Sequence, residues 1–427
     1  MITRLLYTVL LIIASPLLLF GLYRSKPNKP HFGWRWKEHF GLAPKLETTE
    51  PPIWIHAVSV GECIAAKPLI KALKKQNPEQ PILITTTTST GAKEIEKLGD
   101  IIAHRYMPLD FSFAIRFFLK KINPCQLLII ETELWPNTLN EVHRFDIPIT
   151  IVNARLSEKS YQNYAKIQFL FNEIHPKISK ILCQTQVDAD RFERLGVPSE
   201  KIEITGSIKF DIEVSDNNIK SGLKLREKIG INRPVWIAAS THKGEDEIIL
   251  NAHKLILKTY PSTLLILVPR HPERFATIHN LCTKNGYKTT QRTDNEIITK
   301  DHSVYIGNTM GEMLTLISSS DVCFMGGSLI GNTVGGHNLL EPAALGKPML
   351  IGPSYFNFKD ITEQLLKVKS VDIVSNASEI SKEIISKFDD KELLALTGDA
   401  AKEVVKKNQG AIRNTLIALD LKMELSQ

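Results

Sequence analysis

The residues best suited to proton transfer in this sequence are carboxylates that closely follow apolar runs. Glu62 lies in the stretch IHAVSVGE, where an apolar run from 53 to 58 leads through Gly61 into a helical pattern. A carboxylate there can take the proton of a hydroxyl nucleophile, provided that burial offsets the pKa-lowering effect of the helix dipole. The same carboxylate can instead cap the helix, which stabilises it by about 0.3–1 kcal/mol. The local sequence leaves both roles open.

Two further acids, Glu131 and Glu133, lie in the stretch ETELWPN, directly after another apolar run. On an extended segment, residues two apart share a face, so these carboxylates are expected to point the same way. Paired carboxylates are typical of acid–base catalysis or metal binding, but no His or Asp cluster accompanies them. At least one of them can be structural, capping loop amides or pairing with Arg155. Lys209, in GSIKFD, either contacts a ligand or bridges two domains.

A glycine-rich region in the second half of the chain is suited to binding an anion. The turn Gly326-Gly327-Ser328 follows an apolar run, and a second turn at 335–338, which contains Gly336, is expected to open a helix at Asn338. Glycines let backbone N–H groups approach a phosphate closely, and a helix N-terminus favours negative charge. The region therefore predicts a phosphate site, although glycine-rich turns are often only turns.

Three side chains can complete such a site. Arg270 and His271, in PRHPER, add donors, and Glu341, one helical turn beyond Asn338, can accept hydrogen bonds from ribose hydroxyls. Glu341 can equally be a solvated helix residue. The pattern is neither Gly-x-Gly-x-x-Gly nor a P-loop, which disfavours dinucleotide and nucleoside triphosphate binding.

These residues fall in loops between apolar runs and helical patterns that alternate along the chain. We expect strands at 53–58, 82–86, 102–107, 127–130, 147–152, 181–184, 235–240, 264–269 and 348–353, and near Tyr305 and Val322. Strand–helix–strand alternation predicts parallel sheets covered by helices on both faces. Ligands of such sheets bind outside the carboxyl ends of the strands. The predicted fold class is α/β, with two doubly wound, Rossmann-like domains whose loops face a common cleft.

The length of 427 residues also favours two domains, because single cores rarely grow beyond about 250–300 residues. We expect an N-terminal anchor at 1–24 and two domains, at 25–210 and 211–427. The polar stretch 205–233 is interpreted as the connection between the domains. The segment 391–423 is predicted to be helical with breaks at Gly398 and Gly410, and its final helices can pack back on the N-terminal domain.

The N-terminus predicts a membrane anchor. Residues 5–23 carry no charge and are about long enough to cross a bilayer as a helix. One base precedes this run and five follow it, namely Arg4 before and Arg24, Lys26, Lys29, Arg35 and Lys37 after. The positive-inside rule then places the body of the protein in the cytoplasm. A cleaved signal peptide is the alternative, but no convincing cleavage site follows the run.

Charge, cysteine content and the absence of several motifs disfavour some classes of function. The net charge of +7 favours an anionic partner, and the five scattered cysteines indicate a reducing compartment. Gly-x-Ser-x-Gly, His-Glu-x-x-His and basic–aromatic repeats are all absent from the sequence. Hydrolase, metalloprotease and nucleic-acid-binding functions are therefore disfavoured.

Nine collinear motifs together resemble the 3-deoxy-D-manno-octulosonic acid (Kdo) transferase family of Gram-negative bacteria. They are HAVSVGE, ETELWPN, NARLS, GSIKFD, STHKGE, LVPRHPERF, GNTMGE, GGHNLLEP and GPSYFNFKD. The resemblance spans nearly the whole chain. It implies a GT-B glycosyltransferase on the cytoplasmic face of the inner membrane, which moves Kdo from CMP-Kdo to the lipid A precursor lipid IVA. It also implies that no metal or other cofactor is needed.

The resemblance also implies that 25–210 is the acceptor-binding domain and 211–427 the CMP-sugar donor-binding domain, and it implies roles for particular residues. Glu62, in Ser-Val-Gly-Glu, is expected to be the catalytic base. CMP binding is expected at Arg270, His271, Met310, Gly311, Glu312, Gly326, Gly327, Ser328, Gly336, Asn338 and Glu341. Support for the acceptor or the transition state is expected from Ser59, Gly61, Thr90, Glu131, Glu133, Arg155 and Lys209. Residues 330–334 have no expected role, because the segment around them is longer than in some members.

Two other functions remain open on the sequence. One is a membrane-associated GT-B transferase that uses a UDP-sugar, which UDP rather than CMP should inhibit. The other is a non-catalytic nucleotide-sugar-binding protein, for which Glu62 would be dispensable.

Overall fold

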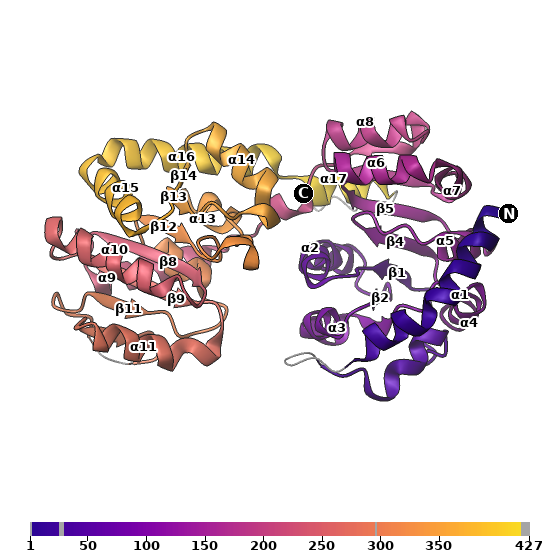
Figure 1. Cartoon of the computed structure of the whole chain (residues 1–427), viewed down its shortest axis with the longest axis horizontal. Coiled ribbons are helices and arrows are strands. Elements are labelled where there is room, and N and C mark those ends of the chain that lie inside the picture. The colour runs from indigo at the N-terminus through magenta and orange to yellow at the C-terminus, as the bar shows by residue number, and fades with distance from the viewer. Residues whose placement is uncertain (1, 25–29, 295–296, 420–427) are drawn as a thin grey trace. The chain divides into compact units, whose positions relative to one another are not determined.

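The computed structural model describes residues 2–24, 30–294 and 297–419. These residues form two compact units (Figure 1). Unit 1 contains the chain up to Asp211 together with the segment that begins at Gln409, and unit 2 contains Ile212–Asn408.

Unit 1 is built on a sheet of seven parallel strands in the order β3-β2-β1-β4-β5-β6-β7. The strands are β1 (Ile53–His56), β2 (Ile82–Thr86), β3 (Ala103–Tyr106), β4 (Gln126–Ile130), β5 (Ile149–Ala154), β6 (Lys180–Cys183) and β7 (Ile202–Ile204). The helices are α1 (Ile2–Tyr23), α2 (Val60–Gln76), α3 (Ser89–Ile95), α4 (Ser112–Ile122), α5 (Pro136–Arg144), α6 (Glu158–Lys166), α7 (Gln168–Ile174), α8 (Gln186–Arg194) and α17 (Ala411–Ala418). The strand order reverses between β1 and β4, so the ligand crevice of this sheet is expected there.

The side chains of β1 alternate between two apolar layers, as the pleat of a strand requires. Trp54 packs into a cluster with Phe118 of α4 and Phe192 of α8. Ile55 packs into the opposite cluster with Leu69 of α2. Both faces of the sheet are therefore covered, which explains why these strands are nearly continuous apolar runs in the sequence.

Unit 2 has a second sheet of seven parallel strands, in the order β10-β11-β9-β8-β12-β13-β14. The strands are β8 (Val235–Thr241), β9 (Leu264–Pro269), β10 (Thr289–Gln291), β11 (Val304–Ile306), β12 (Val322–Met325), β13 (Met349–Ile351) and β14 (Val371–Ile373). The helices are α9 (Asp216–Ile229), α10 (Asp246–Thr259), α11 (Phe275–Lys284), α12 (Met313–Ser318), α13 (Leu340–Ala344), α14 (Lys359–Lys367), α15 (Ala377–Asp389) and α16 (Lys391–Asn408). Here the order reverses between β8 and β12.

Short 3₁₀ helices complete the chain. They are η1 (Gly33–Phe40), η2 (Glu96–Ile101), η3 (His175–Lys177), η4 (Ser199–Lys201), η5 (Ile208–Phe210), η6 (Pro272–Arg274), η7 (Gly331–Thr333) and η8 (Phe356–Phe358).

The segment 205–233, interpreted from the sequence as the connection between the domains, contains the point at which the chain passes from unit 1 to unit 2. About half of it is α9, a helix that was not predicted; it is capped by the Ser215 hydroxyl and buries Gly222, Leu225 and Ile229. These three positions recur at helical spacing, but the polar residues between them hide the pattern.

The predicted break at Gly398 is also wrong. A Cβ at this position would lie 2.1 Å from the Gly346 carbonyl oxygen, so glycine permits close packing of an uninterrupted α16. The predicted break at Gly410 is confirmed, since the residue is left-handed and precedes α17. Residues 420–423 of the predicted helix lie outside the described residues.

The predicted apolar N-terminal helix is confirmed as α1. Its segment Thr3–Tyr23 has a mean hydropathy of 2.4 and is long and apolar enough to cross a membrane. Lys26 and Lys29, two of the bases that follow it, lie outside the described residues.

Candidate functional site

Glu62 lies at the crevice of unit 1, in the first turn of α2 directly after β1. Its side chain is only 7% exposed. One carboxylate oxygen accepts from the Val58 N–H at 2.7 Å, and the other accepts from the Ser59 hydroxyl at 2.8 Å. The Ser59 hydroxyl in turn accepts from the Glu62 N–H at 3.3 Å. Glu62 and Ser59 thus cap the helix reciprocally, as predicted for the capping role.

Capping leaves the acid–base chemistry of Glu62 intact. Burial raises the pKa of Glu62, hydrogen bonds from Val58 and Ser59 oppose that shift, and the charge of Glu131 adds to it. Each carboxylate oxygen has a second lone pair. Glu62 can therefore cap α2 and still accept a proton.

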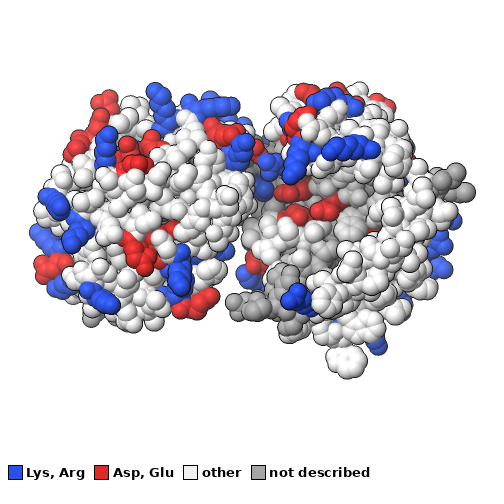
Figure 2. Space-filling model, in the orientation of Figure 1, with Lys and Arg blue, Asp and Glu red and all other residues white. Residues whose placement is uncertain are grey.

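The acids predicted from ETELWPN gather with Glu62 around one cavity of about 390 Å³. Its walls come from the start of α2, the loops after β4 and β5, and α6. The lining residues are Glu62, Glu131, Thr132, Glu133, Arg155, Leu156, Ser157, Ser160 and Tyr164. Figure 2 shows acidic side chains gathered in a hollow on the visible face of unit 1. Burial raises the pKa of Glu133, and the negative charge of Glu62 raises it further by a smaller amount.

The route by which Glu131 and Glu133 share this cavity differs from the prediction. Glu131 has a φ of 62° and is not extended, and Thr132 lines the same cavity instead of pointing away. A non-glycine residue with positive φ is strained, and such strain concentrates at functional sites. The Glu131 carboxylate pairs with Lys209 of η5 at 3.3 Å.

The remaining predicted residues of unit 1 divide into two groups. Arg155 lines the Glu62 cavity and is tied to it through its backbone, which exchanges hydrogen bonds with the Thr132 hydroxyl. Gly61 has open space around its Cβ position, with only the Ser59 hydroxyl near, at 3.7 Å. Thr90 lies elsewhere, in a separate cavity of about 690 Å³ beside the end of α1.

In unit 2 the crevice between β8 and β12 holds a buried carboxylate that was not predicted. Glu245, in the loop before α10, is 0% exposed. It accepts from the backbone N–H groups of Gly327 at 2.7 Å, Ser328 at 2.9 Å and Leu329 at 2.9 Å. It also accepts from the N–H of His242 at 2.8 Å. One carboxylate thus joins the loops after the two strands.

This arrangement corrects the prediction of a phosphate cradle at Gly326–Ser328. The N–H groups of Gly327 and Ser328 point at Glu245, so they are already engaged. Gly326 serves close packing, because a Cβ there would lie 2.6 Å from the Ser240 carbonyl oxygen. The helix after GGHN begins at Leu340 and not at Asn338, whose side chain instead accepts from the Leu340 N–H at 3.0 Å.

Basic and aromatic side chains lie beside the turn at 327–329, whose N–H groups donate to Glu245. The His242 and His337 rings contact each other through Nε2 atoms 2.8 Å apart, and His271 stands edge-on to His242 with ring centroids 5.3 Å apart. Burial, then the His242 and Arg270 charges, lowers the pKa of His337 to about 4. Burial raises the pKa of Glu341, and the Arg270 charge opposes this shift. These groups can bind an anion and a hydroxyl.

The loop 310–312 was predicted to contact CMP. Glu312 forms a bidentate ion pair with Arg292, at 3.1 and 2.8 Å, so its carboxylate is engaged within unit 2. Met310 and Gly311 are exposed. Gly336 donates its N–H to the Gly327 carbonyl at 2.8 Å and so links the two glycine turns.

In the described part of the chain, no group of three or more His, Cys, Asp or Glu side chains is arranged to hold a metal ion. The metal-independent reaction stays a prediction.

Three residues of these sites escaped the sequence analysis: Glu245, His242 and Tyr164. The motifs SVGE and STHKGE share a serine, a glycine and then an acid after an apolar run, which is the signal that could have identified Glu245. Tyr164 lies in the Glu62 cavity, where burial and the Glu133 charge raise its pKa to about 12. Nothing local in the sequence marks it.

Comparison with known proteins adds independent evidence. The family model described as 3-Deoxy-D-manno-octulosonic-acid transferase (kdotransferase) matches residues 34–212. The 3-deoxy-D-manno-octulosonic acid transferase of Haemophilus influenzae is 39% identical over 416 residues, covering 97% of each chain. That of Bordetella pertussis is 32% identical, covering 86% of this chain and 87% of the other.

Among solved structures, UDP-GlcNAc 2-epimerase from Neisseria meningitidis aligns with a TM-score of 0.52 at 16% identity, covering 83% of this chain and 98% of the other. At this identity the likeness concerns the fold alone. With the two parallel sheets, it confirms the predicted GT-B class of two doubly wound domains. The relatives in Haemophilus and Bordetella settle the family: this chain belongs to the 3-deoxy-D-manno-octulosonic acid transferases, which are glycosyltransferases.

Proposed function

We propose that this protein transfers Kdo from CMP-Kdo to a hydroxyl of lipid IVA with inversion, and that Glu62 is the general base. The observation that carries the proposal is the cavity at the β1/β4 crevice of unit 1. A buried carboxylate with a raised pKa stands there beside two further acids. A raised pKa makes a carboxylate a stronger base, which suits proton transfer from a sugar hydroxyl.

The reaction begins with the acceptor hydroxyl bound in the Glu62 cavity. Its oxygen forms a bond to the anomeric carbon of Kdo while its proton moves to Glu62. The bond from that carbon to the CMP phosphate oxygen breaks on the opposite face, and its electron pair stays on the departing phosphate. Arg155 and Lys209 offset the negative charge of the clustered acids, since Lys209 already pairs with Glu131.

The donor binds in unit 2, beside the turn at 327–329 that is hydrogen-bonded to Glu245. Because that turn's amides are engaged, we assign the phosphate charge to Arg270 and the neighbouring histidines instead. The Glu341 carboxylate has no hydrogen-bond partner among the described residues, which leaves it for the ribose hydroxyls. The Arg270 charge and the N–H donors of the histidine rings at the leaving phosphate would supply the stabilisation that a divalent metal gives in other transferases.

The enzyme is proposed to work on the cytoplasmic face of the inner membrane. The apolar helix α1 is suited to a lipid environment. The proposed acceptor substrate of the enzyme, lipid IVA, would carry phosphates and acyl chains. The basic residues after α1 would favour an anionic surface, each by about 1 kcal/mol close to the headgroups.

The product identifies the reaction. Purified full-length protein is incubated with CMP-Kdo and lipid IVA, and the lipid is analysed by mass spectrometry. The expected product is lipid IVA with one or more Kdo residues added, and CMP but not UDP should inhibit its formation. A product formed only from a UDP-sugar would overturn the proposal.

The role of Glu62 has a separate test in the same assay. Glu62→Gln keeps the hydrogen-bonding shape but removes the base, so turnover should be lost while CMP-Kdo affinity is retained. The matched variant Glu193→Gln, at an exposed position on α8, should behave like the native enzyme. Retained turnover, or loss of donor binding, in Glu62→Gln would remove Glu62 from the proposed role.

A further inference from the structure

Helix α1 has two chemically different faces. Its half-buried positions include Thr3, Arg4, Tyr7, Thr8 and Ser15, which are all of its polar side chains before Tyr23. Its outward positions are apolar, with Leu5, Leu6, Val9, Leu10, Ile12, Ile13, Leu17, Leu18 and Phe20 exposed. Figure 2 shows the surface over α1 as a continuous area without charged side chains. The polar residues from Thr3 to Thr8 therefore face the body of unit 1, whereas the Ser15 hydroxyl donates to the Ile12 carbonyl of its own helix.

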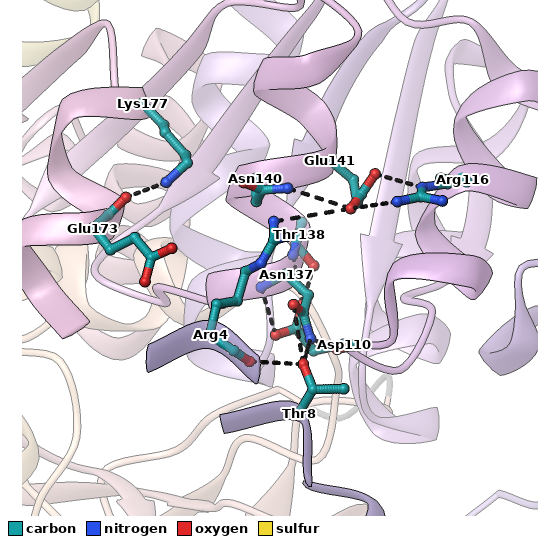
Figure 3. A network of polar contacts seen from close by, with 10 residues as sticks. All are labelled: Arg4, Thr8, Asp110, Arg116, Asn137, Thr138, Asn140, Glu141, Glu173 and Lys177. Carbon is teal, nitrogen blue, oxygen red and sulfur yellow. Dashed lines mark hydrogen bonds and ion pairs between the residues drawn. The ribbon is translucent and has the colours of Figure 1, made fainter. Parts of the chain in front are cut away.

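The inward face of α1 is held by a buried polar network (Figure 3). The Thr8 hydroxyl accepts from the Asn137 side-chain amide at 3.0 Å, and Arg4 stands 4.0 Å from the carboxylate of Glu141. Asn137 and Glu141 belong to α5 and are each 1% exposed. Thr8 and Arg4 therefore attach α1 to buried side chains of unit 1.

The network continues to Asp110, which is 1% exposed. Its carboxylate accepts from the N–H groups of Asn137 at 3.0 Å and Thr138 at 2.6 Å, at the start of α5. The Tyr7 hydroxyl of α1 also hydrogen-bonds to it. A helix surrounded by lipid on all sides would leave these α1 hydroxyls and the Arg4 guanidinium without such partners.

The surface beside α1 has the composition of a membrane interface. Helix α4 begins two residues after Asp110 and turns Phe113 and Phe117 outward, each 50% exposed. Its outward face also carries Lys120 and Lys121. Trp34 of η1, 86% exposed, is among the most exposed apolar side chains described. Apolar and aromatic side chains flanked by bases fit the headgroup region of an anionic leaflet.

We infer that α1 lies in the plane of one leaflet, docked on unit 1, and does not cross the bilayer. Its outward face is buried among acyl chains, and the bases of α4 face anionic headgroups. The 22 residues would extend about 33 Å, enough to span, so the docking contacts and not the length decide the orientation. The inference rests on the membrane attachment in the proposed function and gives that attachment a geometry.

Crosslinking in membranes tests the docking directly. In a Cys125→Ser background, which removes the one exposed cysteine among those described, Thr8→Cys is combined with Asn137→Cys. Oxidation by dioxygen with copper phenanthroline in membranes should join the two thiols as a disulfide and shift the migration of the protein on a gel. The control pair, Val9→Cys with Asn137→Cys, places the first thiol on the outward face and should crosslink several-fold less. Equal, background-level crosslinking of both pairs would overturn the inference.

Topology gives a second measurement that leaves the network intact. A cysteine appended before Met1 and an Arg24→Cys substitution mark the two ends of α1. A membrane-impermeant maleimide should label both in inverted vesicles and neither in intact spheroplasts. Labelling of the appended cysteine from the outside would show a spanning helix. Neither readout depends on Kdo transfer, so a docked α1 in an enzyme without transfer activity would reject the proposed function and leave this inference standing.

Discussion

At the scale of single residues, Glu62 has a pKa that its neighbours set in opposite directions. Burial and the Glu131 charge raise it, while the Val58 N–H and the Ser59 hydroxyl lower it. A base acts when deprotonated, so kcat/KM should fall as pH falls through this raised pKa. Glu131→Gln removes a like charge and should lower the Glu62 pKa, which moves the acidic limb of the kcat/KM profile to lower pH.

The control for this shift is Glu193→Gln, which should leave the profile in place. An acidic limb that stays fixed in Glu131→Gln would mean that the two carboxylates do not interact. A limb that moves to higher pH would contradict the sign of the effect.

Glu245 makes a different prediction, about stability and donor binding. Glu245→Ala leaves the N–H groups of Gly327, Ser328 and Leu329 without their acceptor and should lower the free energy of unfolding by roughly 3 kcal/mol. Glu245→Gln keeps one acceptor oxygen and should recover part of that loss. Chemical denaturation measures the stability.

Donor binding separates positioning from stability alone. If Glu245 positions the loops beside Arg270 and His337, Glu245→Gln should raise KM for CMP-Kdo more than it lowers kcat. A variant with lowered stability and native KM would restrict Glu245 to a purely structural role.

The sequence identified Glu62, Glu131 and Glu133 because each follows an apolar strand, where ligand loops lie. It could not reveal the backbone conformation of these loops or the partners of their N–H groups. Glu131 adopts a left-handed conformation, and the amides of Gly327 and Ser328 face an internal carboxylate. A glycine turn has the same letters whether its N–H groups face a phosphate or a glutamate. Only the structure separates those cases.

At the scale of elements, burial decides what can be predicted. Strands such as β1 and β9 are buried on both faces and appear as continuous apolar runs, so their positions were predicted to within a few residues. Helix α9 was missed because only three of its residues are buried. The edge strands β10 and β14 are only three residues long, which is too short for a periodic signal.

Helix α4 carries a prediction about membrane binding. Phe113→Ser with Phe117→Ser should weaken binding to anionic vesicles by about tenfold or more, because burying one Phe side chain contributes about 1.5–3 kcal/mol. The matched control, Leu393→Ser with Leu396→Ser on α16, changes two exposed apolar residues of unit 2 and should leave binding unchanged. Vesicle sedimentation measures both. Equal losses in the two variants would mean that α4 does not contact the bilayer.

At the scale of the whole molecule, unit 1 is completed by the far end of the chain. The Asp211 carboxylate accepts from the N–H groups of Gly410 and Ile412, at 2.6 and 2.5 Å. From there α17 packs its Ala418 into the apolar cluster that holds Leu69 of α2. The chain thus leaves unit 1 after Asp211, forms unit 2 and returns to the residue at which it left.

This closure makes Asp211 a stabilising residue for unit 1. Asp211→Ala removes two hydrogen bonds from backbone N–H groups to a charged acceptor and should lower the free energy of unfolding of α17 by about 2–3 kcal/mol. Hydrogen exchange followed by mass spectrometry reads the units separately in the full chain. Exchange should become roughly 30–150 times faster in α17, since every 1.4 kcal/mol corresponds to a factor of about 10. It should also quicken in the part of α2 that α17 covers, while unit 2 keeps its native rates.

Asp399→Ala, at an exposed position of α16, is the control and should change exchange in neither unit. If Asp211→Ala quickened exchange in both units equally, the two would unfold together, and the return of α17 would stabilise the entire chain and not unit 1 alone.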